Sequence, residues 1–153
     1  MRVEEEYIVK RFKTSMEALK LAAVALEKAG FSVSWSLGCV VAARPSGSAV
    51  VCRDKVEGDG VAVFTAYMIL LASAGAVAMK SVASDVVLDV ANIYARGKAP
   101  DGEVYFTPLS PRVFRLSAMS SSTASAVLAA LARDGMIVEK PVISRRRPRV
   151  GEA

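Results

Sequence analysis

The sequence predicts a mixed α/β (α+β) protein in which an N-terminal β-α-β-β module, a central apolar helix and a C-terminal module follow one another. Segments with alternating apolar and polar residues, typical of strands, are interspersed with segments whose apolar residues recur at helical spacing. Gly and Pro separate these segments, and 19 residues in the middle of the chain carry no charge. Because 53% of the 153 residues are hydrophobic, the chain is expected to fold around a packed core.

Residues 1–60 are predicted to form the β-α-β-β module. Residues 5–14 alternate apolar and polar side chains and contain β-branched residues, as a strand does. Thr14 and Glu17 have the spacing of a capping box, and Gly30 is suited to end the helix that this box would start. The expected buried face of the helix consists of Leu19, Ala22, Ala23 and Leu26.

A hairpin is predicted after this helix, with strands over residues 31–43 and 49–54. The segment Arg44–Gly47 between them has a good turn sequence. A turn centred between positions 45 and 46 places Cys39 directly opposite Cys52, within the separation that a disulfide needs. A change of one residue in turn length would instead leave two buried free thiols.

Residues 61–79 are the uncharged stretch, and its length is close to that needed to cross a bilayer. Thr65, Ser73 and Gly75 interrupt it, and aromatic residues do not flank it on both sides. Three interpretations remain open. The stretch is a helix buried in the core or in a dimer, a strand over 61–65 that runs into such a helix, or a membrane span over 61–79.

Residues 81–153 are predicted to form a third unit. A helix is expected over Ser81–Arg96, because Val82, Val86, Val90 and Ile93 are spaced by four, four and three residues. A short strand is expected over Glu103–Thr107, and a short helix from Pro111.

A second helix is expected after Ser120, which is suited to cap it, with Gly135 as its left-handed exit. Residues 136–138 then open a strand. The outer face of this helix would carry Ser121, Ser122 and Ser125, and its apolar stripe would consist of Ala124, Val127, Leu128 and Leu131.

From Ser110 onward the chain resembles the winged-helix (helix-turn-helix) transcription regulators, in the broad sense that includes the MarR- and GntR-like families. The features that carry the resemblance are the turn at 118–120, the hydroxyl-rich helix start at 121–123, the paired apolar positions and the stop at Asp134-Gly135. The resemblance covers about residues 81–150. It implies a winged-helix module whose first helix is Ser81–Arg96 and whose small strand is Glu103–Thr107, with the helix-turn-helix itself from Pro111 onward. It also implies DNA as the partner.

Positive charge concentrates near the C-terminus of a chain whose formal net charge is +5. A local positive field suits phosphate contacts, and the free amides of a helix start suit a phosphate or a base edge. We therefore expect a non-enzymatic protein that binds double-stranded DNA, or RNA, as a homodimer or as a subunit of a complex. The candidate contacts are Ser120, Ser121, Ser122, Thr123, Ser125, Arg133, Lys140, Arg145, Arg146, Arg147 and Arg149.

Two other classes of function stay open. The outer face of the expected recognition helix is formed by Ser and Ala with only Arg133 charged, and so smooth a face also suits a protein-interaction subunit of a larger assembly. A membrane-anchored protein would use residues 61–79 as its span.

Enzymatic activity is not expected. The chain has no His and two Cys, so it lacks the ligands for a tetrahedral zinc site and the residues for a Ser/His or Cys/His pair, and neither a metal nor a cofactor is predicted. The absence of Gln and the presence of a single Asn, beside abundant charge, are typical of a thermophile. The charged N-terminus lacks a secretory signal pattern, and this predicts a cytoplasmic protein.

Overall fold

The computed structural model describes residues 2–141, which form three helices and two antiparallel sheets, a mixed α+β fold as the sequence predicts. The helices are α1 (Met16–Lys28), α2 (Gly60–Met79) and α3 (Ser121–Arg133). One sheet has six strands, in the order β10 (Ile137–Glu139), β1 (Val3–Arg11), β9 (Val113–Ala118), β8 (Gly102–Ser110), β7 (Tyr94–Ala99) and β6 (Ser84–Asp89). The other has four strands, in the order β2 (Ser32–Ser36), β3 (Cys39–Arg44), β4 (Gly47–Val51) and β5 (Val56–Gly58).

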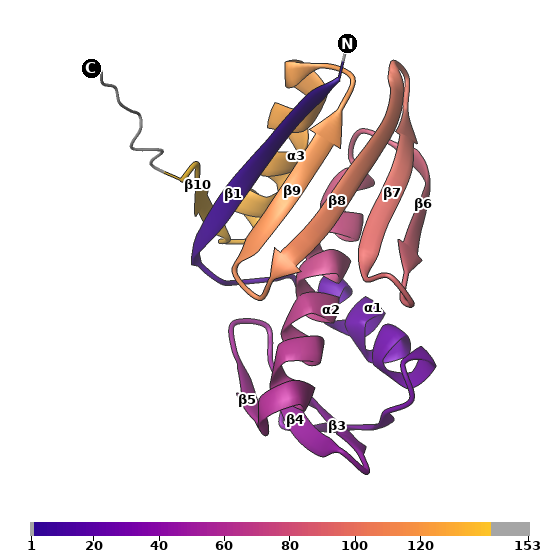
Figure 1. Ribbon diagram of the computed structural model, residues 1–153, viewed down its shortest axis with the longest axis vertical. Coiled ribbons are helices and arrows are strands. Elements are labelled where there is room, and N and C mark those ends of the chain that lie inside the picture. The colour runs from indigo at the N-terminus through magenta and orange to yellow at the C-terminus, as the bar shows by residue number, and fades with distance from the viewer. Residues whose placement is uncertain (1, 142–153) are drawn as a thin grey trace, which may run out of the picture.

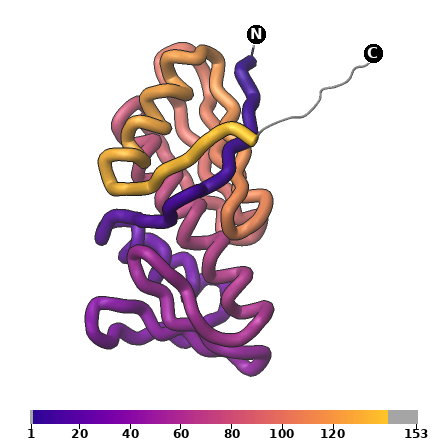
Figure 2. Tube along the Cα trace, turned by 90° about the vertical axis from the view of Figure 1, so that its left-hand side faces the viewer, coloured from indigo at the N-terminus to yellow at the C-terminus, as the bar shows by residue number. Residues whose placement is uncertain are grey.

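Helix α2 runs through the centre of the molecule, from the four-stranded sheet up to the six-stranded sheet (Figures 1 and 2). It packs against both sheets and both other helices, and most of its side chains are buried. A helix that is buried over most of its length needs no polar face, which explains its largely apolar sequence. The helix begins at Gly60, so the alternative of a strand over 61–65 is wrong. Within residues 2–141, α2 is the one helix long and apolar enough to cross a bilayer, and 61% of its most apolar window is buried.

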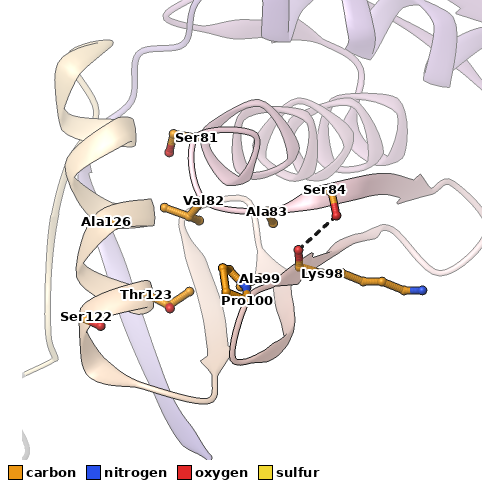
Figure 3. Close-up of a pocket in the computed structure, with 10 residues that line it drawn as sticks. All are labelled: Ser81, Val82, Ala83, Ser84, Lys98, Ala99, Pro100, Ser122, Thr123 and Ala126. Atoms are coloured by element: carbon orange, nitrogen blue, oxygen red, sulfur yellow. Dashed lines mark hydrogen bonds between the residues drawn. The ribbon is translucent and has the colours of Figure 1, made fainter.

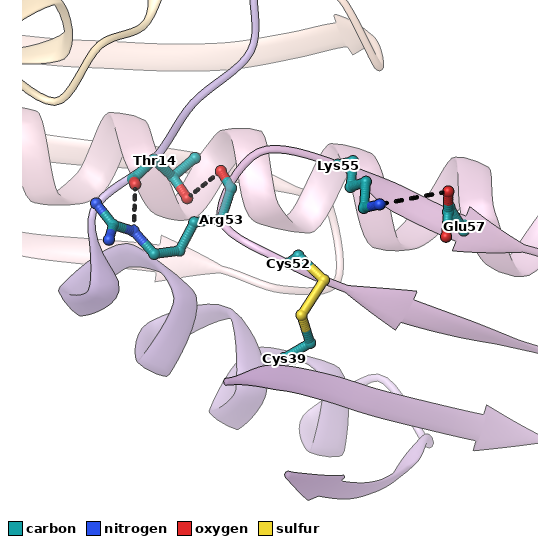
Figure 4. The surroundings of a disulfide bond; sticks show 6 residues. All are labelled: Thr14, Cys39, Cys52, Arg53, Lys55 and Glu57. Carbon is teal, nitrogen blue, oxygen red and sulfur yellow. Dashed lines mark hydrogen bonds and ion pairs between the residues drawn. A yellow bond between two sulfur atoms is a disulfide. The ribbon is translucent and has the colours of Figure 1, made fainter. Parts of the chain in front are cut away.

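Helix α1 forms where the sequence predicts it, but its cap differs. Ser15, not Thr14, is the N-cap, and its side chain accepts a hydrogen bond from the Ala18 amide. Thr14 is buried and bonded to Arg53 in both directions (Figure 4): its amide and its hydroxyl each donate to the Arg53 carbonyl at 2.8 Å, and Arg53 Nε donates to the Thr14 carbonyl. These bonds tie the start of α1 to the loop between β4 and β5.

The predicted hairpin is confirmed in register. Arg44 lies opposite Gly47, and Cys39 forms a disulfide with Cys52, with Cα atoms 4.6 Å apart (Figure 4). The single strand expected over residues 31–43 is wrong, because a tight turn at Leu37 and Gly38 divides it into β2 and β3. Both turn residues have positive φ, as is typical of the two-residue turns that join the strands of a hairpin.

Two helices expected in the C-terminal unit are strands. The segment expected as a helix over Ser81–Arg96 folds as β6 and part of β7, and the segment expected as a helix from Pro111 folds as β9. The apolar residues of both segments also alternate, and in the sheet this alternation directs Val86, Leu88 and Val90 toward the core. The predicted strand over 103–107 is confirmed within β8, and the predicted second helix is confirmed as α3.

Strand β1 hydrogen-bonds to β9 and β10, so the first strand and the last strands of the described chain share one sheet. Behind this pairing, the rings of Tyr7 and Phe114 stack with centroids 5.5 Å apart, and those of Phe114 and Phe106 with centroids 4.3 Å apart. This aromatic column lies on the face of the sheet that α2 and α3 cover, while the opposite face carries none of the helices within residues 2–141 (Figure 1).

Candidate nucleic-acid interface

Helix α3 and its N-cap hold six of the eleven nucleic-acid contacts predicted from the sequence. Ser120 is its N-cap, and its Oγ accepts a hydrogen bond from the Thr123 amide. The side chains of Ser121, Ser122 and Ser125 face solvent, as predicted. The opposite side of the helix packs against the sheet, with Ala124, Val127, Ala130 and Leu131 buried.

The positive residues of this region do not gather around the α3 serines. Arg133 is the one charged residue of α3 and lies in its last turn, about 18 Å from the first at 1.5 Å per residue. Lys140 follows β10 and pairs with Glu5 at 2.9 Å, a contact that raises the pKa of Lys140. Arg145, Arg146, Arg147 and Arg149 lie outside the described residues. Within residues 2–141, the predicted hydroxyl groups therefore lie together at the start of α3, whereas the predicted cations Arg133 and Lys140 lie away from them.

A groove of about 720 Å³ lies between the start of α3, the end of α2 and strands β6 and β7 (Figure 3). The exposed Ser122 and the half-buried Thr123 line it, and Lys98 extends away from them. The Asp101 carboxylate accepts a hydrogen bond from Thr123 Oγ1 at 3.3 Å. An acidic group thus already lies at this helix start, which weakens the groove as a site for phosphate.

The uncovered face of the six-stranded sheet, which we call the open face, has a different composition. Strand alternation sends Phe106 and Phe114 toward the helices and sends their neighbours Tyr105 and Arg115 outward. One row of paired residues crosses this face from β1 to β7, and its members are Glu4, Ser117, Tyr105 and Arg96.

A shallow cleft of about 470 Å³ lies in the middle of the open face. The rings of Tyr94 and Tyr105 lie side by side in it, with centroids 6.3 Å apart and planes inclined by 33°. The Arg2 guanidinium stands 5.3 Å from the centre of the Tyr105 ring. Arg2 is held there because its Nη1 donates to Ser117 Oγ at 2.9 Å and to the Glu103 carbonyl at 3.0 Å.

The open face carries charges of both signs. Its cations include Arg2, Arg96, Lys98 and Arg115, and its acids include Glu4, Glu6 and Glu103. Two of these acids are engaged within the face. Glu6 pairs with Arg115 at 3.3 Å, and Glu103 accepts a hydrogen bond from the Tyr105 hydroxyl, which raises the pKa of Tyr105. Aromatic rings, guanidinium groups and hydroxyls therefore meet on one solvent-accessible surface.

The prediction from sequence missed this surface, although a signal for it is present. Tyr94, Arg96 and Lys98 alternate with Ala95 and small residues, and Tyr105 and Thr107 alternate with apolar residues in the same way. The signal was lost because residues up to 96 were expected in a helix, which gives those side chains a different direction.

Comparisons with known protein families, with curated proteins and with solved structures found no match for this chain. Within residues 2–141, no group of three or more His, Cys, Asp or Glu side chains has the arrangement of a metal site.

Proposed function

We propose that this protein binds single-stranded nucleic acid, without enzymatic action, on the open face of its six-stranded sheet. The observation that carries the proposal is the cluster of Tyr94, Tyr105 and Arg2 in the cleft of that face. Unpaired bases bind proteins chiefly by stacking on aromatic rings and on guanidinium planes, and exposed sheets are a common platform for both.

Two members of the cluster are held by hydrogen bonds within the protein. Arg2 is fixed by two hydrogen bonds and Tyr105 by its bond to Glu103, so base stacking would immobilise little that is still free. The exposed face of Tyr94 and the hydroxyl of Thr107 remain accessible in the cleft. Stacking with few specific donors favours binding that tolerates many sequences.

Phosphate contacts in this proposal come from two places. Arg96 and Lys98 are exposed on β7, where Arg96 lies opposite Tyr105 and Lys98 lies opposite Glu103. The basic segment, Arg145 to Arg149, begins six residues after Glu139, the last residue of the edge strand β10. At no more than about 3.5 Å per residue, the chain between them spans at most roughly 21 Å. Because the charges of the open face nearly balance, this segment supplies the larger part of the electrostatic attraction.

Binding of a duplex through α3 remains a separate prediction. A helix that enters a groove needs side chains that reach base edges, and α3 offers hydroxyls and methyl groups over most of its length. The open face, with its two tyrosine rings in a shallow cleft, is better matched to splayed bases than to a duplex.

The proposal is tested by fluorescence anisotropy with labelled single-stranded RNA and DNA and with a duplex of the same length. Stacking contributes about 1–3 kcal/mol per base, so Tyr94→Ala and Tyr105→Ala should each weaken single-strand binding by roughly 5- to 150-fold. Tyr94→Phe keeps the ring and should leave most of the affinity. Replacing Arg145, Arg146, Arg147 and Arg149 with Ala should flatten the log–log salt dependence by about 0.7 per lost phosphate contact.

Arg133→Ala and Ser122→Ala on α3 are the matched controls, because they lie on a different face and leave the cleft intact. Unchanged binding in the tyrosine variants, together with loss of binding in the α3 variants, would move the interface to α3. No measurable affinity for any single strand at low salt would overturn the proposal.

A further inference from the structure

The free edge of the four-stranded sheet differs from the other edges of the described structure. Four described strands lie at sheet edges. β10 and β5 have three residues each, and β6 has an irregular register and a residue with positive φ at Asp85. β2 has five residues in unbroken register with β3, and its sequence SVSWS contains neither charge nor Pro. Protein sheets usually protect such an edge, because its backbone groups are ready to pair with another strand.

Strand β2 also leaves apolar surface exposed beside this edge. Trp35 of β2 is 48% exposed and Val24 of α1 is 49% exposed. Together with Val33 they line a groove between α1 and β2, whose charged members are Lys20 and Glu27. The edge therefore combines unpaired backbone with an adjoining apolar groove, and both extend along α1.

The sequence of β2 reads nearly the same in both directions around Ser34. An antiparallel pairing of two β2 strands centred on this residue places Val33 of each copy opposite Trp35 of the other. An aromatic residue opposite a β-branched one is a favourable cross-strand pair. The serines at 32, 34 and 36 lie on the other face of the sheet, where their small side chains do not obstruct the pairing.

The charges beside the groove fit the same two-fold arrangement. Helix α1 runs opposite to β2, so Lys20 lies toward the Trp35 end of the groove and Glu27 toward the Val33 end. The two-fold symmetry that pairs Val33 with the partner's Trp35 therefore also brings Lys20 of each copy toward Glu27 of the other. A foreign strand would not by itself supply this reciprocal match.

We propose that the partner of this edge is a second copy of the same chain, which pairs through β2 to form a continuous eight-stranded antiparallel sheet. Backbone hydrogen bonds between the β2 strands, burial of both Trp35 side chains and two reciprocal Lys20–Glu27 pairs hold the dimer together. The open face of the six-stranded sheet is not part of this interface, so the dimer presents two copies of it.

The charge match provides a test that a folding defect cannot imitate. Lys20→Glu creates two Glu–Glu contacts in its own dimer, and Glu27→Lys creates two Lys–Lys contacts. Each variant alone should dimerise more weakly, with a dissociation constant raised about tenfold or more. An equimolar mixture of the two restores both opposite-charge pairs and should regain the wild-type affinity as a heterodimer. Sedimentation equilibrium at low salt over a range of concentrations measures all three.

Trp35→Lys should abolish the dimer, whereas Val61→Lys, which changes a still more exposed apolar residue in the first turn of α2, should leave it intact. Thermal melts of both variants show whether each is folded. A wild-type protein that stays monomeric at all concentrations would overturn the proposal, and so would single charge variants that dimerise as strongly as the wild type.

Discussion

Gly75 of α2 lies directly against the ring of Phe106 of β8, and a Cβ at position 75 would overlap the ring atoms. Phe106 is fully buried and stacks on Phe114, so it has no space into which to retreat. The absence of a side chain at this point lets the central helix approach the six-stranded sheet closely. A Gly that interrupts an otherwise apolar helix thus has a packing role here.

Gly75→Ala should therefore destabilise the protein, although Ala is the better helix former. Helix propensity favours Ala by about 1 kcal/mol, but forcing atoms into a packed core commonly costs about 1–3 kcal/mol or more. Gly60→Ala is the control, because the space around Gly60 in the first turn of α2 is open. Chemical denaturation of both variants measures the difference, and an equal gain in stability for both would contradict the packing.

The Cys39–Cys52 bond should contribute to stability mainly by restricting the unfolded chain. The cysteines are 13 residues apart, and a loop of this size corresponds to about 3 kcal/mol. The double variant Cys39→Ala/Cys52→Ala should lower the free energy of unfolding by roughly that amount, and reduction of the native protein should have the same effect. A thiol titration of the denatured, unreduced protein should detect no free thiol, and two thiols per chain would show that the bond is absent.

Two leucines of α3 should respond differently to truncation. Leu131 is buried, and Leu131→Ala should cost about 2–5 kcal/mol because it leaves a cavity. Leu128 was predicted to be a core residue as well, but it is only partly buried and lines an open groove beside β10. Leu128→Ala should therefore cost clearly less than Leu131→Ala. Equal losses in urea denaturation would mean that the groove is closed in solution.

Tyr105 should ionise at a higher pH than a free tyrosine, because its hydroxyl donates to the Glu103 carboxylate. Since the folded-state pKa lies above the unfolded value of about 10, this bond stabilises the fold fully below that pH. The contribution is lost as pH rises through the raised pKa. A spectrophotometric titration of phenolate follows this, and Glu103→Gln should shift the Tyr105 transition to lower pH. An unchanged titration curve would contradict the assigned hydrogen bond.

The elements that the sequence predicted correctly depend on residues close together in the chain. Ser120 and Gly135 mark the ends of α3 by local capping, and the turn Arg44–Gly47 sets the register that brings Cys39 to Cys52. Such interactions span a few residues and persist in almost any surroundings. The α+β class, the helix α3 and the disulfide were therefore available from the sequence alone.

The tertiary structure decided the remaining elements. Where a segment could locally form either a helix or a strand, its contacts with residues distant in the sequence determined which of the two formed. The valines near 82–90 fit a helix or a strand, and pairing of β6 with β7 selected the strand. No local signal indicates that β1 pairs with β9 and β10, more than 100 residues later in the chain. The open face exists only as a result of that pairing and of helices that cover one side of the sheet. The residues that form it are close in space and far apart in sequence, and periodicity along the chain cannot bring them together.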